Sequence, residues 1–305
     1  MGINGLVQFL KKREYNVEKL IPMANFDGEL LSIDANSVFY PSMCIIYQQV
    51  SEAITVTDDI CNDIFDLCTE RWQNTVRGLH YNIISSGMYP IYIFDGDVPV
   101  EKLETVEERK LSKIKQICGT EYMQCLNIAA DEPCTVQLDS KQLRNMFRFS
   151  RYIRTAFISY ITDVLGGAAW QADSEADPIC AALVVQGHSN VVYSMDNDML
   201  TYGVKYMANK IIGVHFNVKE LAGILEKMQA TLPQFKEFCI ICGCDYNKRI
   251  PRKGPAFAEK VLRGKVDLTD EQKMYLKLDR CKELFDVEQI DLNPLLTYIN
   301  QVYDL

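Results

Sequence analysis

The sequence predicts an α/β protein in which helices flank a central, mostly parallel sheet. Short apolar runs in 28–40, 90–97 and 190–194 are typical of buried strands, and acidic residues follow each of them closely. Amphipathic helical segments separate these runs along the chain, as in repeated β-α-β units. Because ligand sites in such sheets form beyond the carboxyl ends of the strands, we expect the acids to meet at one edge.

The composition limits the class of protein. The chain has 305 residues, 48% of them hydrophobic, which is enough for one large core or two modest domains. No apolar run is long enough to span a bilayer and the N-terminus lacks the layout of a signal peptide, so we expect an intracellular protein with no membrane partner. Its 11 cysteines are therefore expected to be reduced thiols.

The charge is unevenly distributed. The formal net charge of −9 argues against non-specific binding to nucleic acid. However, 248–265 carries seven basic residues against one acid, with Lys253 beside Gly254. The segment 141–154 holds five basic residues and no acid: Lys141, Arg144, Arg148, Arg151 and Arg154. Taken alone, each segment is as consistent with a solvated helix face as with phosphate binding.

Two pairs of acids lie around one predicted β-α-β unit. A helix start carries Glu175 and Asp177, and the end of the strand at 190–194 carries Asp196 and Asp198. Either pair alone is ordinary capping or turn chemistry. Four carboxylates in one crevice, however, would repel each other unless cations held them. Oxygen ligands of this kind suit Mg²⁺ or Mn²⁺ rather than zinc.

Three further acids are placed in a similar way. Asp34 ends the strand in 28–40, Asp95 follows the strand in 90–97, and Asp245 ends a largely apolar helical segment. Tyr40 lies within two helical turns of Asp34, so its ring can line the same crevice. The sequence therefore predicts that seven acids contribute to one metal site.

Helical periodicity predicts long helices between these acids. Residues 57–86 form an amphipathic helix. Residues 101–116 form a charged helix on which Lys102 and Arg109, two turns apart, share one face. Residues 117–140 lack periodicity, which predicts a mobile loop or cap.

The rest of the chain continues the alternation of strands and helices. We expect a helix over 141–165, strands over 168–171 and 210–216, helices over 217–229, 233–246 and 250–263, and two helices within 270–303. The helix at 250–263 follows a tight glycine turn, whose backbone N–H groups could hold a phosphate.

The spacing C-x-x-C-x-C at Cys239, Cys242 and Cys244 invites a zinc site. A fourth ligand at suitable spacing is missing and the flanks are apolar, so we expect buried structural thiols instead. The three histidines are scattered without the spacing of a metal motif, and we expect them to be structural or on the surface.

Six motifs, in order along the chain, resemble those of the structure-specific 5′ nucleases of the flap endonuclease superfamily. The opening MGINGLVQFL is similar to that family's Met-Gly-Ile-x-Gly-Leu start, and SIDANSVFY is similar to its first acidic strand. PIYIFDGDVP is similar to its "vF-D-G-x-x-P" strand and turn. DSEADPICAAL resembles its "SEAEAxCA" helix start and SMDNDMLTYG its "D-x-D-x-L-x-F-G" turn. GCDYNKRIPRKGPAFA resembles its junction into a helix–two-turn–helix element, and the likeness extends to about Arg263.

The resemblance implies a PIN-like nuclease fold, with a nuclease core over 1–245, a helical arch over 101–140, and a helix–two-turn–helix and C-terminal helical region over 246–305. It implies a flap endonuclease or 5′-3′ exonuclease that acts on branched or nicked double-stranded DNA with a 5′ end, for DNA replication, repair or recombination. It also implies two Mg²⁺ (or Mn²⁺) ions in the active site and a K⁺ ion at the helix–two-turn–helix.

The resemblance also implies roles for individual residues. Lys102 and Arg109 match two basic residues that stabilise charge on the scissile phosphate. Tyr40 matches a residue that stacks on a base, and Gly2 matches an N-terminus ordered near the site. The metal-binding acids would be Asp34, Asp95, Glu175, Asp177, Asp196, Asp198 and Asp245, all but the last also counted as catalytic. From the basic segments we expect further DNA contacts at Lys141, Arg144, Arg148, Arg151, Lys253 and Gly254.

The chain departs from the family pattern at three places. Arg252 stands where the family has the first glycine of a G-x-G loop, so only Gly254 remains. Asp177 replaces a glutamate by a carboxylate one methylene shorter. The C-terminal NPLLTYINQVYDL shows no sliding-clamp peptide with paired aromatics, so clamp binding is not expected. Such a compact member is similar to those of some large DNA viruses, which makes a nuclear or cytoplasmic location, including a viral replication site, the expectation.

Two alternatives stay open. A resolvase or a single-strand ribonuclease on the same fold would keep the metal chemistry and change the substrate. A cleavage-dead member would instead bind and organise DNA ends. The presence of all seven acids and both basic residues argues against the cleavage-dead alternative.

Overall fold

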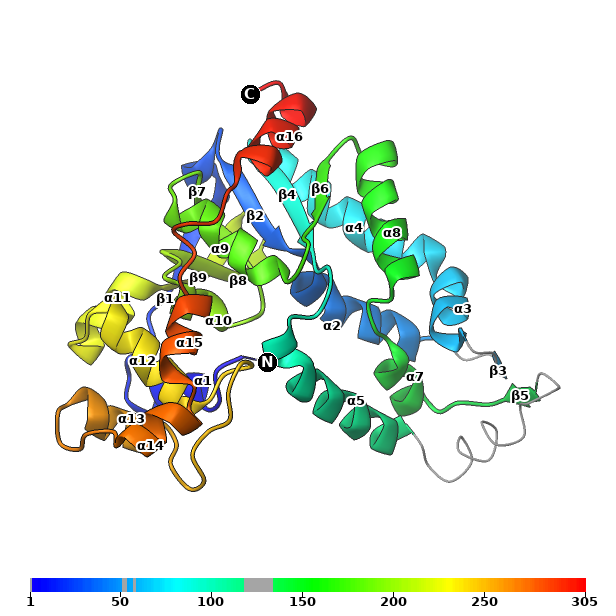
Figure 1. The fold of residues 1–305 in the computed structure, drawn as a ribbon. Coiled ribbons are helices and arrows are strands. Elements are labelled where there is room, and N and C mark those ends of the chain that lie inside the picture. The colour runs from blue at the N-terminus through cyan, green and yellow to red at the C-terminus, as the bar shows by residue number, and fades with distance from the viewer. Residues whose placement is uncertain (1, 51–53, 57–58, 118–133) are drawn as a thin grey trace.

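The structure is a computed structural model that describes residues 2–50, 54–56, 59–117 and 134–305. Its centre is a seven-stranded sheet with the strand order β1-β9-β8-β7-β2-β4-β6 (Figure 1). Five neighbouring strands run parallel: β2 (Leu30–Asp34), β4 (Tyr89–Phe94), β6 (Ala168–Gln171), β7 (Ser189–Tyr193) and β8 (Tyr206–Ile212). The strands β9 (His215–Glu220) and β1 (Glu18–Pro22) form an antiparallel edge. The predicted mostly parallel α/β fold is therefore confirmed.

The central strands are buried because helices cover both faces of the sheet. Along β4, Ile91 and Ile93 point into one core, while Tyr92 and Phe94 point into the other. The core around Tyr92 is completed by α2 (Ala35–Gln48), α4 (Thr69–Ile84) and α8 (Arg151–Ser159). The core around Ile91 is completed mainly by α9 (Ala176–Val185), α10 (Asp198–Tyr202), α11 (Leu221–Met228) and α12 (Leu232–Cys242).

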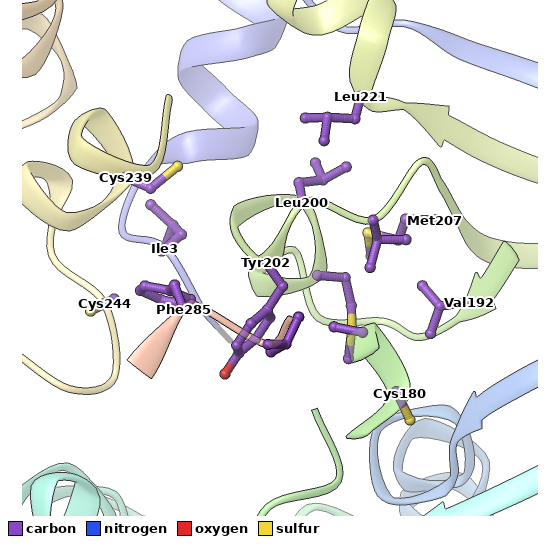
Figure 2. Close-up of a cluster of buried hydrophobic side chains, with 14 of the residues drawn as sticks. Ile3, Cys180, Val192, Leu200, Tyr202, Met207, Leu221, Cys239, Cys244 and Phe285 are labelled. Atoms are coloured by element: carbon purple, nitrogen blue, oxygen red, sulfur yellow. The ribbon is translucent and has the colours of Figure 1, made fainter. Parts of the chain in front are cut away.

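The C-terminal helices pack into this second core rather than into one of their own. Figure 2 shows Phe285 from the end of α15 (Leu278–Leu284) beside Tyr202, in the cluster that contains Val192 of β7 and Leu200 of α10. The other helices of this region are α13 (Pro255–Leu262), α14 (Asp270–Tyr275) and α16 (Asn293–Tyr303), so the prediction of two helices over 270–303 was wrong by one. The division into 1–245 and 246–305 stays a prediction.

Two predicted long helices are interrupted. The segment 57–86 contains α3 (Ile60–Leu67) and α4, separated at Cys68, where φ is −101° and ψ is 10°. The break lets Phe65 stack on Trp72, with ring centroids 5.0 Å apart. Because apolar spacing continues across the break, periodicity could not reveal it.

The predicted helix over 141–165 is also interrupted. It consists of α7 (Ser140–Met146), α8 and a π-helical turn (Tyr160–Val164). Between α7 and α8 the buried ring of Phe147 packs against Tyr47 at 5.2 Å, and the Ser150 side chain then caps α8. Tertiary packing of one aromatic side chain therefore overrides the local helical pattern here.

The prediction of a strand over 210–216 followed by a helix over 217–229 was wrong. The segment is a β-hairpin in which β8 and β9 pair antiparallel, and α11 begins only at Leu221. Gly213 has a left-handed φ of 59°, so it turns the chain rather than extending it. A lone glycine within an apolar run gave no local sign that the chain reverses.

Two short segments form the described part of the predicted arch and its surroundings. A short 3-10 helix (Val100–Lys102) leads into α5 (Leu103–Ile117), and β5 (Cys134–Val136) pairs with β3 (Ile54–Val56). Residues 118–133 of the predicted cap lie outside the described residues. In the part of the chain that is described, no helix has both the length and the apolar character needed to cross a membrane.

Candidate active site

Asp34 lies at the junction of β2 and α2, at the carboxyl edge of the sheet. One of its oxygens caps α2 by accepting from the Ser37 backbone N–H at 3.1 Å, and the other accepts from the Ser194 hydroxyl at 2.8 Å. Its side chain is only 3% exposed. Burial raises the pKa of Asp34, and the hydrogen bonds from Ser37 and Ser194 oppose that rise. The carboxylate is therefore fixed in orientation at an electrostatic cost.

Asp95 follows the adjacent parallel strand, β4. Its carboxylate accepts from the backbone N–H of Ala176 at 2.8 Å and from the Asn36 side-chain amide at 2.5 Å. Burial, and then the nearby charge of Asp34, raise the pKa of Asp95. Because Ala176 opens α9, the first of these bonds ties Asp95 to the helix start that carries the next acids.

Glu175 and Asp177 lie at the N-terminus of α9. Glu175 accepts from the ammonium of Lys102 with one oxygen and from the Tyr246 hydroxyl, at 2.7 Å, with the other. Burial raises the pKa of Asp177 well above its usual range, and the charge of Asp34 raises it further. The acid that is one methylene shorter than the family's glutamate thus still lies within the electrostatic field of the other carboxylates.

Asp196 and Asp198 follow β7, and they are close to each other. The Asp198 backbone N–H donates to an Asp196 oxygen at 3.1 Å, and both side chains are buried. Burial raises the pKa of each carboxyl, and the charge of Asp196 adds to the effect at Asp198. The Oδ1 atom of Asp198 is buried and has no hydrogen-bond partner among the described residues. Gly2 packs directly against both carboxylates.

Asp245 reaches the site from a separate segment, just after α12. Its oxygens contact Arg109 at 2.6 Å and Lys102 at 3.2 Å. Burial alone would lower the pKa of Lys102, but the carboxylates of Glu175, Asp177 and Asp245 outweigh this effect and raise it above its ordinary value. Lys102 is therefore a fully charged ammonium held among the acids.

One cavity of about 330 Å³ gathers most of the predicted site. Lys102, Arg109, Tyr40 and Arg148 also line it. The predicted acids that line the cavity are Asp34, Asp95, Glu175, Asp177, Asp196 and Asp245. Asp198 is not among the lining residues and lies behind Asp196, against Gly2.

The donor set fits hard divalent cations. It consists of carboxylate oxygens, the ligands that Mg²⁺ and Mn²⁺ prefer. The raised pKa values of Asp34, Asp95, Asp177, Asp196 and Asp198 come from burial and mutual repulsion, both of which a cation would relieve. Among the described residues, no three His, Cys, Asp or Glu side chains are already spaced to hold one ion. The Lys102 ammonium lies between two of the acids instead, so an arriving cation would compete with it.

The remaining predicted DNA contacts lie outside the cavity lining. Lys141 and Arg144 are exposed on α7, and Arg151 is exposed at the start of α8. The Lys253 ammonium lies 4.4 Å from the centre of the Phe257 ring, and Gly254 is the N-cap residue of α13. Their roles in binding DNA stay predictions.

Several residues of the site were not predicted from the sequence. Asn36, Ser194 and Tyr246 hold the acids through hydrogen bonds, and Arg154 lines the cavity with its Nε buried and unpartnered among the described residues. The buried Lys219 donates to the side chain of Asn197, between Asp196 and Asp198. Only Tyr246, the neighbour of Asp245, and Arg154, within a basic segment, had any signal in the sequence. Cys239, Cys242 and Cys244 are buried, as predicted.

Two family models match the chain. The model described as the XPG N-terminal domain matches residues 1–116, and the model described as the XPG I-region matches residues 168–245. Together they account for well over half of the sequence, and they contain all seven predicted acids.

Curated proteins that are similar to the chain include flap endonucleases. The chain is 27% identical over 277 residues to Flap endonuclease 1 of Trypanosoma cruzi, covering 88% of this chain and 66% of that protein. It is 28% identical over 271 residues to Flap endonuclease 1 of Entamoeba histolytica, covering 86% of this chain and 67% of that protein. The chain thus spans about two thirds of the length of these relatives.

Solved structures share the fold. Flap endonuclease-1 from Methanococcus jannaschii superposes with a TM-score of 0.60 and 18% identity, covering 95% of this chain and 91% of that one. The catalytic core of Rad2 in complex with DNA substrate superposes with a TM-score of 0.56 and 16% identity, covering 99% and 84%. At these identities the likeness concerns the fold alone.

The contact at Gly2 generates a first prediction. A Cβ atom at this position would lie 2.2 Å from an Asp196 oxygen and 2.3 Å from an Asp198 oxygen, so Gly2→Ala must displace both carboxylates. We expect the variant to bind Mn²⁺ about tenfold more weakly in isothermal titration calorimetry, the scale of effect seen when the surroundings of metal ligands are disturbed. Gly28→Ala is the matched control, since Gly28 also has a positive φ (78°) but no atom within 4 Å of the added Cβ. Equal Mn²⁺ affinity in the two variants would contradict this placement of Gly2.

The loop before α13 generates a second prediction. Arg252 adopts a left-handed φ of 62°, which costs a residue with a side chain roughly 1–2 kcal/mol. Glycine avoids that cost but loses roughly 0.5–1 kcal/mol through its freedom in the unfolded chain. We therefore expect Arg252→Gly to raise the free energy of unfolding in urea by about 0.5–1 kcal/mol. Lys265→Gly, at an exposed position outside the left-handed region, should not be stabilising.

Proposed function

Because the chain belongs to the superfamily of structure-specific 5′ nucleases, as a flap endonuclease-like member, we propose that it hydrolyses phosphodiesters of branched DNA from the 5′ side with the help of divalent cations. The observation that carries the proposal is the convergence of six carboxylates with Lys102 and Arg109 on one cavity. Cleavage would leave a 5′ phosphate and a 3′ hydroxyl.

The acids would hold two Mg²⁺ (or Mn²⁺) ions. Bound there, such a pair of ions supplies an activated water and neutralises charge on the leaving oxygen. Asp34 and Asp95 are held by fixed donors, and the N-terminus of α9 presents Glu175 and Asp177 beside them. These hydrogen bonds support the proposal because they keep the ligand oxygens in place while the substrate binds.

Lys102 and Arg109 would bind the scissile phosphate. Both are paired with acids of the cavity, Lys102 with Glu175 and Asp245 and Arg109 with Asp245. Once cations neutralise these acids, the two basic side chains are available to the phosphate, where they would stabilise developing negative charge. Their place at the base of the predicted arch, Lys102 at the end of the 3-10 helix and Arg109 on α5, supports this role.

The cavity lining also contains residues suited to binding the DNA strand. Tyr40 presents a half-buried ring there, and Arg148 and Arg154 form no ion pair with any described residue. Basic side chains are needed because the chain carries a net charge of −9. We therefore propose that Arg148, with the exposed Lys141, Arg144 and Arg151, contacts phosphates, and that DNA binding weakens steeply as salt is raised.

The loop before α13 would contact DNA at a second place. Lys253 and Gly254 are proposed to bind a backbone phosphate, with a K⁺ ion in the same loop. The left-handed backbone at Arg252 supports this, because the residue adopts a conformation that glycine normally provides. We propose an intracellular site of action, in the nucleus or the cytoplasm, where branched DNA arises.

Removing one predicted metal ligand tests the chemistry. Asp196→Asn keeps the shape of the side chain but removes a charge that cations need, so we expect cleavage of a 5′-flap duplex with Mg²⁺ to fall by at least about a hundredfold. Asp163→Asn, at an exposed acid outside the cavity, is the control and should cleave normally. Near wild-type cleavage by Asp196→Asn would refute the metal assignment. Comparing flap, nicked, four-way and RNA substrates separates the flap nuclease from a resolvase or ribonuclease.

A second substitution tests the phosphate contact. Lys102→Ala should lower the single-turnover cleavage rate by about tenfold to a hundredfold, with little change in DNA affinity, because its charge acts mainly in the transition state. Affinity is measured in Ca²⁺ and rates in Mg²⁺. Lys110→Ala, at an exposed residue on the following helix, α5, is the control. A large loss of DNA affinity with normal single-turnover chemistry in Lys102→Ala would contradict the assigned role.

A further inference from the structure

Behind the cavity, two buried tyrosine hydroxyls form a hydrogen-bonded chain that ends on Glu175. The Tyr246 hydroxyl donates to a Glu175 oxygen at 2.7 Å, and the hydroxyls of Tyr202 and Tyr246 are 2.8 Å apart. Because Tyr246 has one proton and gives it to the carboxylate, the Tyr202 hydroxyl must donate to the Tyr246 oxygen. The two tyrosines are only 1% and 5% exposed, so bulk water does not replace these bonds.

This chain joins three segments that carry acids. Tyr202 is the last residue of α10, the helix that begins at Asp198, and Tyr246 directly follows Asp245. Glu175 is the N-cap residue of α9. One line of hydrogen bonds therefore connects side chains that come from three separate places in the sequence.

The two rings are themselves held in place by the apolar core. Phe285 packs edge-on against both, with centroid distances of 5.0 Å to Tyr202 and 5.5 Å to Tyr246. Figure 2 shows Tyr202 beside Phe285, with its hydroxyl at the rim of the apolar cluster. The Tyr246 ring also lies beneath the Lys102 ammonium, 5.9 Å from its centroid. Rigid rings leave the hydroxyls little freedom to seek other partners.

We propose that Tyr202 and Tyr246 are positioning residues that fix the Glu175 carboxylate and hold the three acid-bearing segments in register for cation binding. The inference rests on the proposed function of the acid cluster. Tyr246 holds one Glu175 oxygen through a hydrogen bond. The other Glu175 oxygen, which accepts from Lys102 in this structure, is then left facing the cavity. Outer partners of this kind fix the orientation of metal ligands and strengthen binding.

The geometry predicts unequal contributions from the two hydroxyls. Loss of the Tyr246 hydroxyl leaves both a Glu175 oxygen and the Tyr202 hydroxyl without a partner. Loss of the Tyr202 hydroxyl leaves the bond from Tyr246 to Glu175 in place. It removes only the hydrogen bond that polarises the Tyr246 hydroxyl and so strengthens the bond to Glu175. The flap endonuclease motif has phenylalanine at the position of Tyr202, so an apolar ring fits there. Tyr202 acts only through Tyr246, so its effect should disappear when the Tyr246 hydroxyl is absent.

The test uses Tyr202→Phe, Tyr246→Phe and the double variant in the full chain, each of which removes hydroxyl groups and keeps the rings. Mn²⁺ affinity is measured by isothermal titration calorimetry, and kcat and KM are measured on a 5′-flap duplex over a range of Mg²⁺ concentrations. We expect Mn²⁺ affinity to fall about tenfold in Tyr246→Phe and about threefold in Tyr202→Phe. The Mg²⁺ concentration for half-maximal rate should rise by similar factors, with KM for DNA unchanged. The double variant should match Tyr246→Phe.

Tyr298→Phe is the matched control. The hydroxyl of Tyr298, on α16, accepts from the backbone N–H of Ala169, on β6, at 3.1 Å, and neither residue lines the cavity. The Tyr298→Phe substitution should therefore affect stability and leave Mn²⁺ affinity unchanged. The proposal is overturned if Tyr202→Phe binds Mn²⁺ as the control does, or if the effects of Tyr202→Phe and Tyr246→Phe simply add. If the wild-type protein binds Mn²⁺ but cleaves no branched DNA, the proposed function fails, and the Mn²⁺ affinities still decide the positioning role.

Discussion

Repulsion among buried carboxylates is the constraint that the rest of this structure must satisfy. Two unit charges 4 Å apart interact by about 4 kcal/mol at the effective dielectric constant of a protein, whereas a hydrogen bond contributes a net of about 1 kcal/mol. The bonds that Ser37, Ser194 and Asn36 donate can therefore orient the acids but cannot offset their repulsion. Positive charge has to be present, and Lys102 and Arg109 supply it.

This constraint links Lys102, at the end of the 3-10 helix, and Arg109, on α5, to the rest of the site. Two contacts tie the segment that carries them to the C-terminal region. The Thr105 hydroxyl donates to the backbone carbonyl of Asp245 at 2.9 Å, and Arg280 pairs with Glu101 at 2.6 Å. A DNA phosphate would bind Lys102 and Arg109 in place of the acids that now pair with them. The same segment, 100–117, thus neutralises the acid cluster and presents basic side chains to a substrate.

The acids could be picked out from the sequence because each lies at a position with a local signature. A strand end or a helix start is visible in a few residues, so Asp34 and Glu175 could be placed before any contact was known. The hairpin at Gly213 and the break at Cys68 were missed, since apolar spacing continues through both. The bond from Tyr246 to Glu175 spans 71 positions, and no local pattern encodes such a partner.

Two differences from the family motifs, at Arg252 and at Tyr202, show how a fold accommodates substitution. At Arg252 a residue with a side chain stands in place of the family's glycine and has a left-handed φ of 62°, so the loop conformation must be imposed by its surroundings against a local cost. At Tyr202 the ring is kept and a hydroxyl is added, which would be costly in an apolar core without a partner. Tyr246 lies 2.8 Å away and provides one. Arg252 accepts the left-handed backbone at a local cost, and the bond to Tyr246 offsets the cost of burying the Tyr202 hydroxyl. Both changes are therefore compatible with the same arrangement of acids.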